Sequence, residues 1–372
     1  MNPKSTLRIA AIHSQPDVAA GPARSWTAFW FSPSDPIGLH IVRILAGLLF
    51  LGWLLPFAGQ VEAFFSLHGW FDQQAFTQLR QVFTQLGDRP GVLEQFTGWS
   101  ILYLLDDNPV VLQLVYWLSI MVLILFTLGI ATRLTALLSF IIVASFTAPP
   151  PLVYDGDALL VMLAFYLALG YVFLGQRTEG LSPAARLLGS WNTFILARRF
   201  GHLPGRREPS LAANIALRLL QVHMVVVILA SALHKLQFAE WWTGAALWYA
   251  LSPPFETTAE TVRKLAPYLD VLGIAAYVIL AWQLGFPLFA WRVRWRPVLL
   301  GGALLGWFGS AFIYKLPLFG PAIFIGCLAF VTPEEWNGLL GWLSRIRGVS
   351  REVDEPNAKR DRSSSPVASR RS

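Results

Sequence analysis

The sequence predicts an all-α fold, a polytopic transmembrane helical bundle of about eight spans with both termini in the cytoplasm. Of its 372 residues, 55% are hydrophobic and only 14% are charged, and the mean hydropathy is +0.52. A soluble domain of this length is far less apolar. The apolar runs are continuous and about 20 residues long, the length that a helix needs to cross a bilayer. Transmembrane barrels instead show short segments of alternating hydrophobicity, so the runs indicate helices.

Eight apolar runs define the predicted spans. They cover residues 37–56, 109–131, 134–149, 157–175, 211–233, 269–290, 298–314 and 317–332. The runs 134–149 and 317–332 are short for a full crossing, so tilted or re-entrant arrangements remain open. The first run follows a proline-containing tail, no cleavable signal peptide is evident, and the first span is expected to stay in the mature protein.

The distribution of lysine and arginine predicts the orientation, because cytoplasmic loops are richer in both residues. The two tails and the second, fourth and sixth connections hold 21 of them, whereas the opposite connections hold 6. Both termini are therefore expected in the cytoplasm, with Lys235 and Asp157 toward the exterior side of the membrane. Loop topology also accounts for the net charge of +7, so no nucleic-acid partner is expected.

Three regions make up the predicted domain organisation. Residues 1–35 are expected to form a cytoplasmic amino tail, and residues 36–335 the transmembrane domain. The aromatic-rich segment 57–108 is expected to form short interfacial or re-entrant helices that cap the exterior face. Residues 346–372 are expected to be a disordered basic cytoplasmic tail, either solvated or tethered to the membrane surface.

Lys235 ends the fifth run, shortly before Trp241 and Trp242. Tryptophan suits the membrane interface, where its ring lies in lipid and its N–H near water, so Lys235 is expected near one membrane face. The lysine either snorkels to the headgroups or lies in a pocket of the bundle, and both interpretations remain open. Because burial disfavours the ammonium form, a buried Lys235 would be a candidate base.

Arg43 and Arg218 lie within predicted spans, where a charge that faces lipid is costly. Each is expected to point into the bundle and to meet a carboxylate, a carbonyl or a bound anion. His40 lies about one helical turn before Arg43, on a similar face. This pattern predicts either a structural ion pair that fixes helix register or a ligand-binding site that includes all three residues.

Asp155 and Asp157 open the fourth span in the sequence YDGDALL. A carboxylate at a helix start caps free N–H groups and opposes the positive end of the dipole. The alternative is that Asp157 pairs with Lys235 on the same side of the membrane.

His223 and His234 share a face of the fifth span, but about 16 Å of helix separates them. One metal ion cannot bind both, and the sequence has no HExxH motif, so no metal site is predicted. His223 is expected to contact another helix, with ligand binding as the alternative. The single cysteine, Cys327, excludes an internal disulfide.

Five segments together resemble the HTTM family, the bacterial membrane proteins related to the vitamin K-dependent gamma-carboxylase. The segment SALHKLQFAEWWTGAALWYAL is similar to the family's Lys-Leu motif, which a Trp and a Gly follow. The other four, in chain order, are DPIGLHIVRILAGLLFLGWLL, FFSLHGWF, GIATRLTALLSF and LVYDGDALLVMLAFYLAL. The resemblance covers roughly residues 35–335.

The resemblance implies a role for Lys235. In the carboxylase, the motif lysine is the base that deprotonates vitamin K hydroquinone, so the likeness implies Lys235 as base and a quinone as cofactor. His234 stands before the lysine and Ala232 stands where a glycine is common, and the carboxylase has a large soluble segment where this chain has only about 40 residues after its last span. Carboxylation of a protein substrate is therefore not expected.

Three function classes follow from these observations. The first is a membrane enzyme that binds a quinone-like or other apolar small molecule, with Lys235 as base, His234, Asp157 or Arg43 assisting, and Trp242 lining the site. The second is a non-enzymatic envelope or toxin-immunity protein in contact with membrane lipid. A transporter comes third, because neither inverted halves nor paired broken helices are evident.

Overall fold

The computed structural model describes residues 22–66, 69, 100–105, 108–148, 155–175, 209–252, 259–312 and 316–346. The chain divides into two compact units, Met1–Pro333 and Glu334–Ser372. Within the described residues the regular structure is helical, apart from one bridge between Ser34 and Ser210. The all-α fold class is therefore confirmed.

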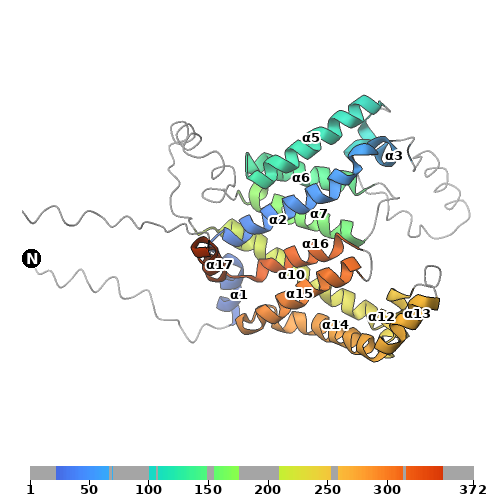
Figure 1. The fold of residues 1–372 in the computed structure, drawn as a ribbon. Coiled ribbons are helices and arrows are strands. Elements are labelled where there is room, and N and C mark those ends of the chain that lie inside the picture. Colours follow the sequence, from blue (N-terminus) through green and yellow to red (C-terminus); the bar gives the residue numbers. More distant parts are fainter. Residues whose placement is uncertain are drawn as a thin grey trace, which may run out of the picture. The chain divides into compact units, whose positions relative to one another are not determined.

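Each of the eight predicted runs overlaps a helix of 9 to 25 residues (Figure 1). These helices are α2 (Ile37–Leu54), α5 (Pro109–Leu128), α6 (Thr132–Phe146), α7 (Asp155–Ala168), α10 (Leu211–Lys235), α14 (Leu269–Phe289), α15 (Arg296–Phe312) and α16 (Phe319–Cys327).

Five helical stretches are long and apolar enough to cross a membrane, which indicates an integral membrane protein. They are Ile37–Gly59, Pro109–Leu128, Gly156–Phe173, Leu211–Lys235 and Arg263–Phe289. Two shorter apolar helices cover Thr132–Phe146 and Phe319–Phe330.

Shorter helices connect and extend the long ones. They are α1 (Pro22–Phe31), η1 (Leu55–Gly59), α3 (Val61–Phe65), η3 (Ile101–Leu104), the π-helical η5 (Leu169–Phe173), α11 (Ala239–Trp242), α12 (Ala246–Leu251), α13 (Ala259–Leu265), η6 (Ala266–Tyr268), η7 (Val293–Trp295), η8 (Leu328–Phe330) and α17 (Pro333–Ile346). Helix α17 opens the second unit. The predicted basic tail lies outside the described residues, except for Ile346.

The expected exterior cap lies partly within the described residues. Its described part contains the short helices η1, α3 and η3. The Phe65 ring packs edge-on against Phe146 of α6, with 4.9 Å between the ring centroids, and Ser100 Oγ donates to the carbonyl of Ser145 at 2.8 Å. Residues 70–99 of the cap lie outside the described residues.

The helix ends follow from local sequence. Asn108 caps α5, because its Oδ1 accepts hydrogen bonds from the backbone N–H groups of Val110 and Val111. Gly129 ends α5 in a left-handed conformation, with φ of 79°. Ser210 caps α10 by accepting a hydrogen bond from the N–H of Ala213.

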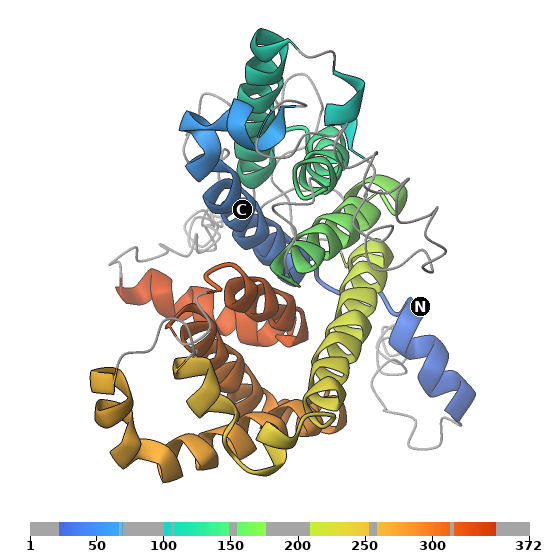
Figure 2. The ribbon, with the colours of Figure 1, turned by 90° about the vertical axis from the view of Figure 1, so that its right-hand side faces the viewer.

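Long helices that follow one another in the chain run antiparallel (Figures 1 and 2). Helices α2, α5, α6 and α7 lie together, α14 packs against α10 and α15, and α16 packs against α15, α10, α7 and α2. Tyr116, near the start of α5, donates at 2.8 Å to the carbonyl of Leu54 at the end of α2.

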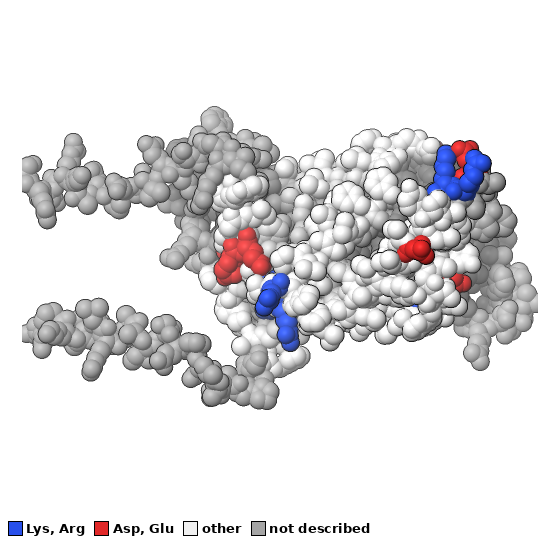
Figure 3. Space-filling model, turned by 60° about the horizontal axis from the view of Figure 1, so that its bottom comes forward, with Lys and Arg blue, Asp and Glu red and all other residues white. Residues whose placement is uncertain are grey.

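Helix α14 and the residues that follow it contain no charged residue between Asp270 and Arg292. Figure 3 shows the same pattern, with charged side chains toward two ends of the face and an uncharged expanse between them.

The amino tail is not entirely a tail, because residues 22–31 form α1. The Asn214 side chain of α10 donates to the carbonyls of Phe29 and Trp30, at 3.1 and 2.8 Å. These carbonyls end α1, so the amide satisfies groups that the helix itself leaves free. Helix α1 therefore belongs to the helical unit.

Candidate functional site

The Lys235 side chain folds back along its own helix. Its Nζ donates to Ser231 Oγ at 2.6 Å and lies 3.5 Å from the Ser231 carbonyl. Residues i and i+4 share a helix face, and helical side chains lean toward the amino end. The half-buried ammonium therefore lies about one turn before the end of α10.

Helix α14 adds a second polar group at this position. Gln283 Nε2 donates to Ser231 Oγ at 3.4 Å. Gln283 is 6 residues before Phe289, the end of α14, and 14 residues after Leu269, its start, which corresponds to about 9 and 21 Å of helix. The ammonium thus lies beside the interior of a candidate span.

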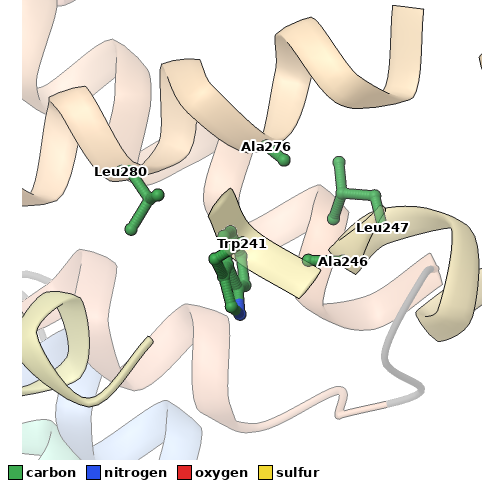
Figure 4. Close-up of a cluster of buried hydrophobic side chains, with 5 residues drawn as sticks. All are labelled: Trp241, Ala246, Leu247, Ala276 and Leu280. Atoms are coloured by element: carbon green, nitrogen blue, oxygen red, sulfur yellow. The ribbon is translucent and has the colours of Figure 1, made fainter. Parts of the chain in front are cut away.

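Trp241 covers the other side of the ammonium. Lys235 Nζ lies 5.4 Å from the centroid of the Trp241 ring, a cation–π distance. The ring is buried, together with Ala246, Leu247, Ala276 and Leu280, between α11, α12 and α14 (Figure 4). We call Ser231, Lys235, Trp241 and Gln283 the Lys235 cluster.

Trp242, the tryptophan expected to line the site, has a different position. Its ring is 63% exposed, and its Nε1 donates to the carbonyl of Leu236 at 2.8 Å. Its own carbonyl accepts a hydrogen bond from Tyr277 of α14 at 2.7 Å. Trp242 therefore ties α11 to its neighbours, while Trp241 faces the lysine.

Two other residues expected to assist Lys235 do not join its cluster. His234 is exposed, and its ring packs edge-on against Phe238 with 5.1 Å between the centroids. Adjacent residues on a helix point about 100° apart, so His234 and Lys235 face different ways. Asp157 is buried in α7. Another carboxylate of the described residues, Glu260, forms an ion pair with Lys264 on α13.

Arg43 and His40 form a separate, fully buried group in α2 with Tyr171 of η5. The Arg43 Nη1 donates to the carbonyls of Phe126 and Thr127, in the last turn of α5. His40 Nδ1 and the Tyr171 hydroxyl are 2.6 Å apart. Of the three predicted partners for Arg43, the structure therefore shows the carbonyl. Tyr171 lies in a π-helical turn, and the periodicity of the sequence does not reveal such turns.

His223 makes the predicted contact with another helix, because its Nδ1 lies 2.8 Å from the Tyr166 hydroxyl of α7. Arg218 donates to Gln221 Oε1 at 2.9 Å and lies over the Phe29 ring, 4.3 Å from the centroid. Neither residue is hydrogen-bonded to the Lys235 cluster.

The predicted site residues thus fall into separate places rather than one pocket. Sequence reasoning missed Ser231, Gln283 and Tyr171. The i, i+4 spacing of Ser231 and Lys235 could have indicated the first contact, but nothing local pairs Gln283 with α10. Among the described residues, no group of three or more His, Cys, Asp and Glu side chains could hold a metal ion.

Comparisons with family models, curated proteins and solved structures found no match for this chain.

Proposed function

We propose that this protein is an HTTM-like membrane protein that binds an apolar small molecule at the Lys235 cluster, with Lys235 as the proton acceptor. One observation carries the proposal. The Lys235 ammonium is half-buried beside the interior of α14, and its partners are a serine hydroxyl and an indole ring. An ionisable group inside a membrane domain marks a functional site by default.

The surroundings of Lys235 suit a base better than a structural ion pair. No ion pair to Lys235 is found in the described part of the chain, and a paired carboxylate would hold the lysine in its charged form. A general base must also lie within hydrogen-bond reach of the proton that it removes. The ligand would approach over the exposed apolar side chains near the cluster, which are Leu233, Phe238 and Trp242. The resemblance to the carboxylase motif favours a quinone-like ligand.

The proposed topology has eight spans, with both termini in the cytoplasm of a bacterial cell and the carboxyl end of α10 toward the exterior. The antiparallel packing of α2 and α5 agrees with the alternation of lysine and arginine in the loops. Arg133, after α5, also donates at 3.3 Å to the carbonyl of Gly175, after α7, and both are predicted on the same side. A tag on each terminus tests the orientation: protease access to the carboxyl tag in intact cells would contradict it.

Lipid is the second proposed partner. Helix α14 exposes a series of large apolar side chains, including Val271, Ile274, Val278 and Leu288. In water this surface would be costly, whereas acyl chains cover it without cost. This apolar surface supports a location in a membrane, and the resemblance to bacterial HTTM proteins is the basis for proposing the bacterial inner membrane.

The decisive experiment compares small molecules that co-purify with the detergent-solubilised protein. Mass spectrometry is applied to the wild type, Lys235→Met, Lys235→Arg and the control Lys264→Met, whose exposed lysine pairs with Glu260 on α13. The wild type and the control are expected to retain the same quinone-class molecule, and Lys235→Met about tenfold less.

Binding and proton transfer are then separated with 2-methyl-1,4-naphthohydroquinone, dialysed under nitrogen. Lys235→Arg keeps the charge but cannot be deprotonated, so we expect it to bind this probe without forming the probe anion. Equal binding by the wild type, Lys235→Met and Lys235→Arg would exclude the proposed role of Lys235.

A non-enzymatic envelope or toxin-immunity protein is the second candidate. The observation that favours it is the dispersal of the buried polar residues, because Arg43 and His223 make helix-to-helix contacts. This candidate predicts that Lys235→Met and Lys235→Arg both leave the cellular phenotype intact.

A further inference from the structure

We infer that Gln283 of α14 is a specificity-determining residue of the Lys235 cluster, where its Oε1 accepts a hydrogen bond from a hydroxyl group of the ligand. This inference rests on the proposed function. It assigns the ligand a chemical class, a hydroxyl-bearing apolar molecule, and it makes α14 a wall of the site.

The first step is the state of the Gln283 amide. Its Nε2 donates to Ser231 Oγ at 3.4 Å, and its Oε1 is buried with no hydrogen-bond partner in the described part of the protein. A buried acceptor without a partner is energetically unfavourable. The cost is removed when a bound molecule donates to it.

The second step is the position of this oxygen. Ser231 Oγ accepts hydrogen bonds from both Lys235 Nζ and Gln283 Nε2. The free acceptor Oε1 and the donor Nζ are therefore on two side chains that share one hydroxyl partner. Gln113 of α5 also has a buried Oε1 without a partner in the described residues, but no lysine is bonded beside it. The pairing with Lys235 distinguishes Gln283.

The third step is the chemistry that suits both groups. A hydroxyl donates one hydrogen bond and accepts others, so its proton can bond to Gln283 Oε1 while its oxygen accepts from Lys235 Nζ–H. When Lys235 is neutral, the same proton can pass to Nζ, which leaves the ligand as an oxyanion beside an ammonium. An ether or a carbonyl group only accepts and would leave Oε1 without a partner.

The test compares two probes that differ in this group, 1-naphthol and 1-methoxynaphthalene. Their Kd values are measured by equilibrium dialysis against the detergent-solubilised full chain, with partition into protein-free micelles subtracted. We expect the wild type to prefer the hydroxyl probe about tenfold, which is the effect of one unsatisfied buried acceptor.

Three variants identify the residue responsible for the preference. Gln283→Met keeps the length of the side chain and removes both polar atoms, so the preference should fall below about twofold while the Kd of the ether stays similar. The matched control Gln113→Met should keep the wild-type preference. Gln283→Glu retains an acceptor and should keep a preference for the hydroxyl probe. This variant tests recognition of the hydroxyl even if Gln283→Met does not fold.

The outcomes distinguish this inference from the proposed function. If Lys235→Met weakens binding of both probes but Gln283→Met keeps the wild-type preference, the role of Gln283 is wrong and the ligand site at Lys235 stands. If both variants bind both probes like the wild type, the cluster is not a ligand site. An equal loss of preference in Gln113→Met would show that the effect is structural and would also overturn the inference.

Discussion

Arg43 of α2 donates a hydrogen bond to the carbonyl of Thr127 at 3.1 Å, and the same nitrogen also bonds to Phe126. Both acceptors belong to the last turn of α5, where carbonyls lack their usual helical partners, and the Phe126 carbonyl also accepts from the N–H of Gly129 at 3.1 Å. The guanidinium is fully buried, and the negative end of the α5 dipole, about half an elementary charge, partly neutralises it. Gly129 leaves room for this arrangement, since a Cβ there would lie 3.1 Å from both terminal guanidinium nitrogens. Arg43 therefore joins two candidate spans.

Replacement of Arg43 should lower the stability of the protein. Arg43→Gln removes the donor to the Thr127 carbonyl and one of two donors to the Phe126 carbonyl, so we expect the free energy of unfolding to fall by about 1–3 kcal/mol. Arg43→Lys keeps the charge but loses the planar fork and should have an intermediate effect. Both are measured by unfolding in mixed detergent and SDS micelles. Arg133→Gln is the control, because Arg133 is exposed and makes one 3.3 Å hydrogen bond. An equal loss of stability in this variant would show that the bonds from Arg43 to the end of α5 contribute little.

Gly47 lies at a close contact between α2 and α5. A Cβ at Gly47 would lie 2.3 Å from Thr127 Oγ1 and 3.1 Å from Thr127 Cβ. We expect Gly47→Ala to lower the free energy of unfolding by about 1–3 kcal/mol. Gly52→Ala, on the same helix with no atom within 4 Å of the added Cβ, should be neutral.

A double variant tests the cause of the Gly47 effect. Thr127 Oγ1 bonds only within its own helix, to the carbonyl of Leu123, so Thr127→Ala alone should cost little. Gly47→Ala with Thr127→Ala should recover about 0.5–2 kcal/mol relative to the sum of the single effects. Strict additivity would mean that the clash with Thr127 is not the cause.

The hydrogen bond between Tyr166 and His223 should stabilise the contact of α7 with α10 without affecting ligand binding. A double-mutant cycle with Tyr166→Phe and His223→Leu should give a coupling of about 0.6 kcal/mol, as is usual between membrane helices. Tyr249→Phe, at an exposed tyrosine, provides the control. His223→Leu should leave the Kd for 1-naphthol unchanged. Tenfold weaker binding would contradict this prediction and would show that His223 takes part in ligand binding.

Gly244 allows the turn between α11 and α12 to lie against α14. Its φ is +75°, and a Cβ would lie 3.2 Å from the Cα of Gly273. Gly244→Ala should lower the free energy of unfolding by about 1–2 kcal/mol. It should also weaken 1-naphthol binding, because α11 carries Trp241 to the lysine. Gly306→Ala, with open space around the added Cβ, is the control for both measurements, and identical behaviour of the two variants would contradict this role.

Much of the fold could be predicted because its determinants are local. Length and hydropathy located a helix in each of the eight predicted runs. The helix starts differ from the predicted ones by at most two residues, whereas α7 and α16 end seven and five residues early, where η5 and η8 follow. Caps such as Asn108 and Gly129 begin or end helices where the sequence changes. The short helix α1 was missed, since its 10 residues are too few for a hydropathy signal. Its attachment to the bundle depends on Asn214, which is 185 residues from Phe29.

The sequence by itself determined the class of this protein, its long helices and the lysine that stands out among apolar residues. Only the tertiary structure decided which polar groups meet. It separated His234 from Lys235, because neighbouring helical residues point in different directions, and it showed that the partner of Arg43 is the end of a helix. It also brought Gln283 to Ser231 across 52 residues. Such contacts depend on the register between packed helices, which interlocking side chains set and which no periodicity along one helix encodes.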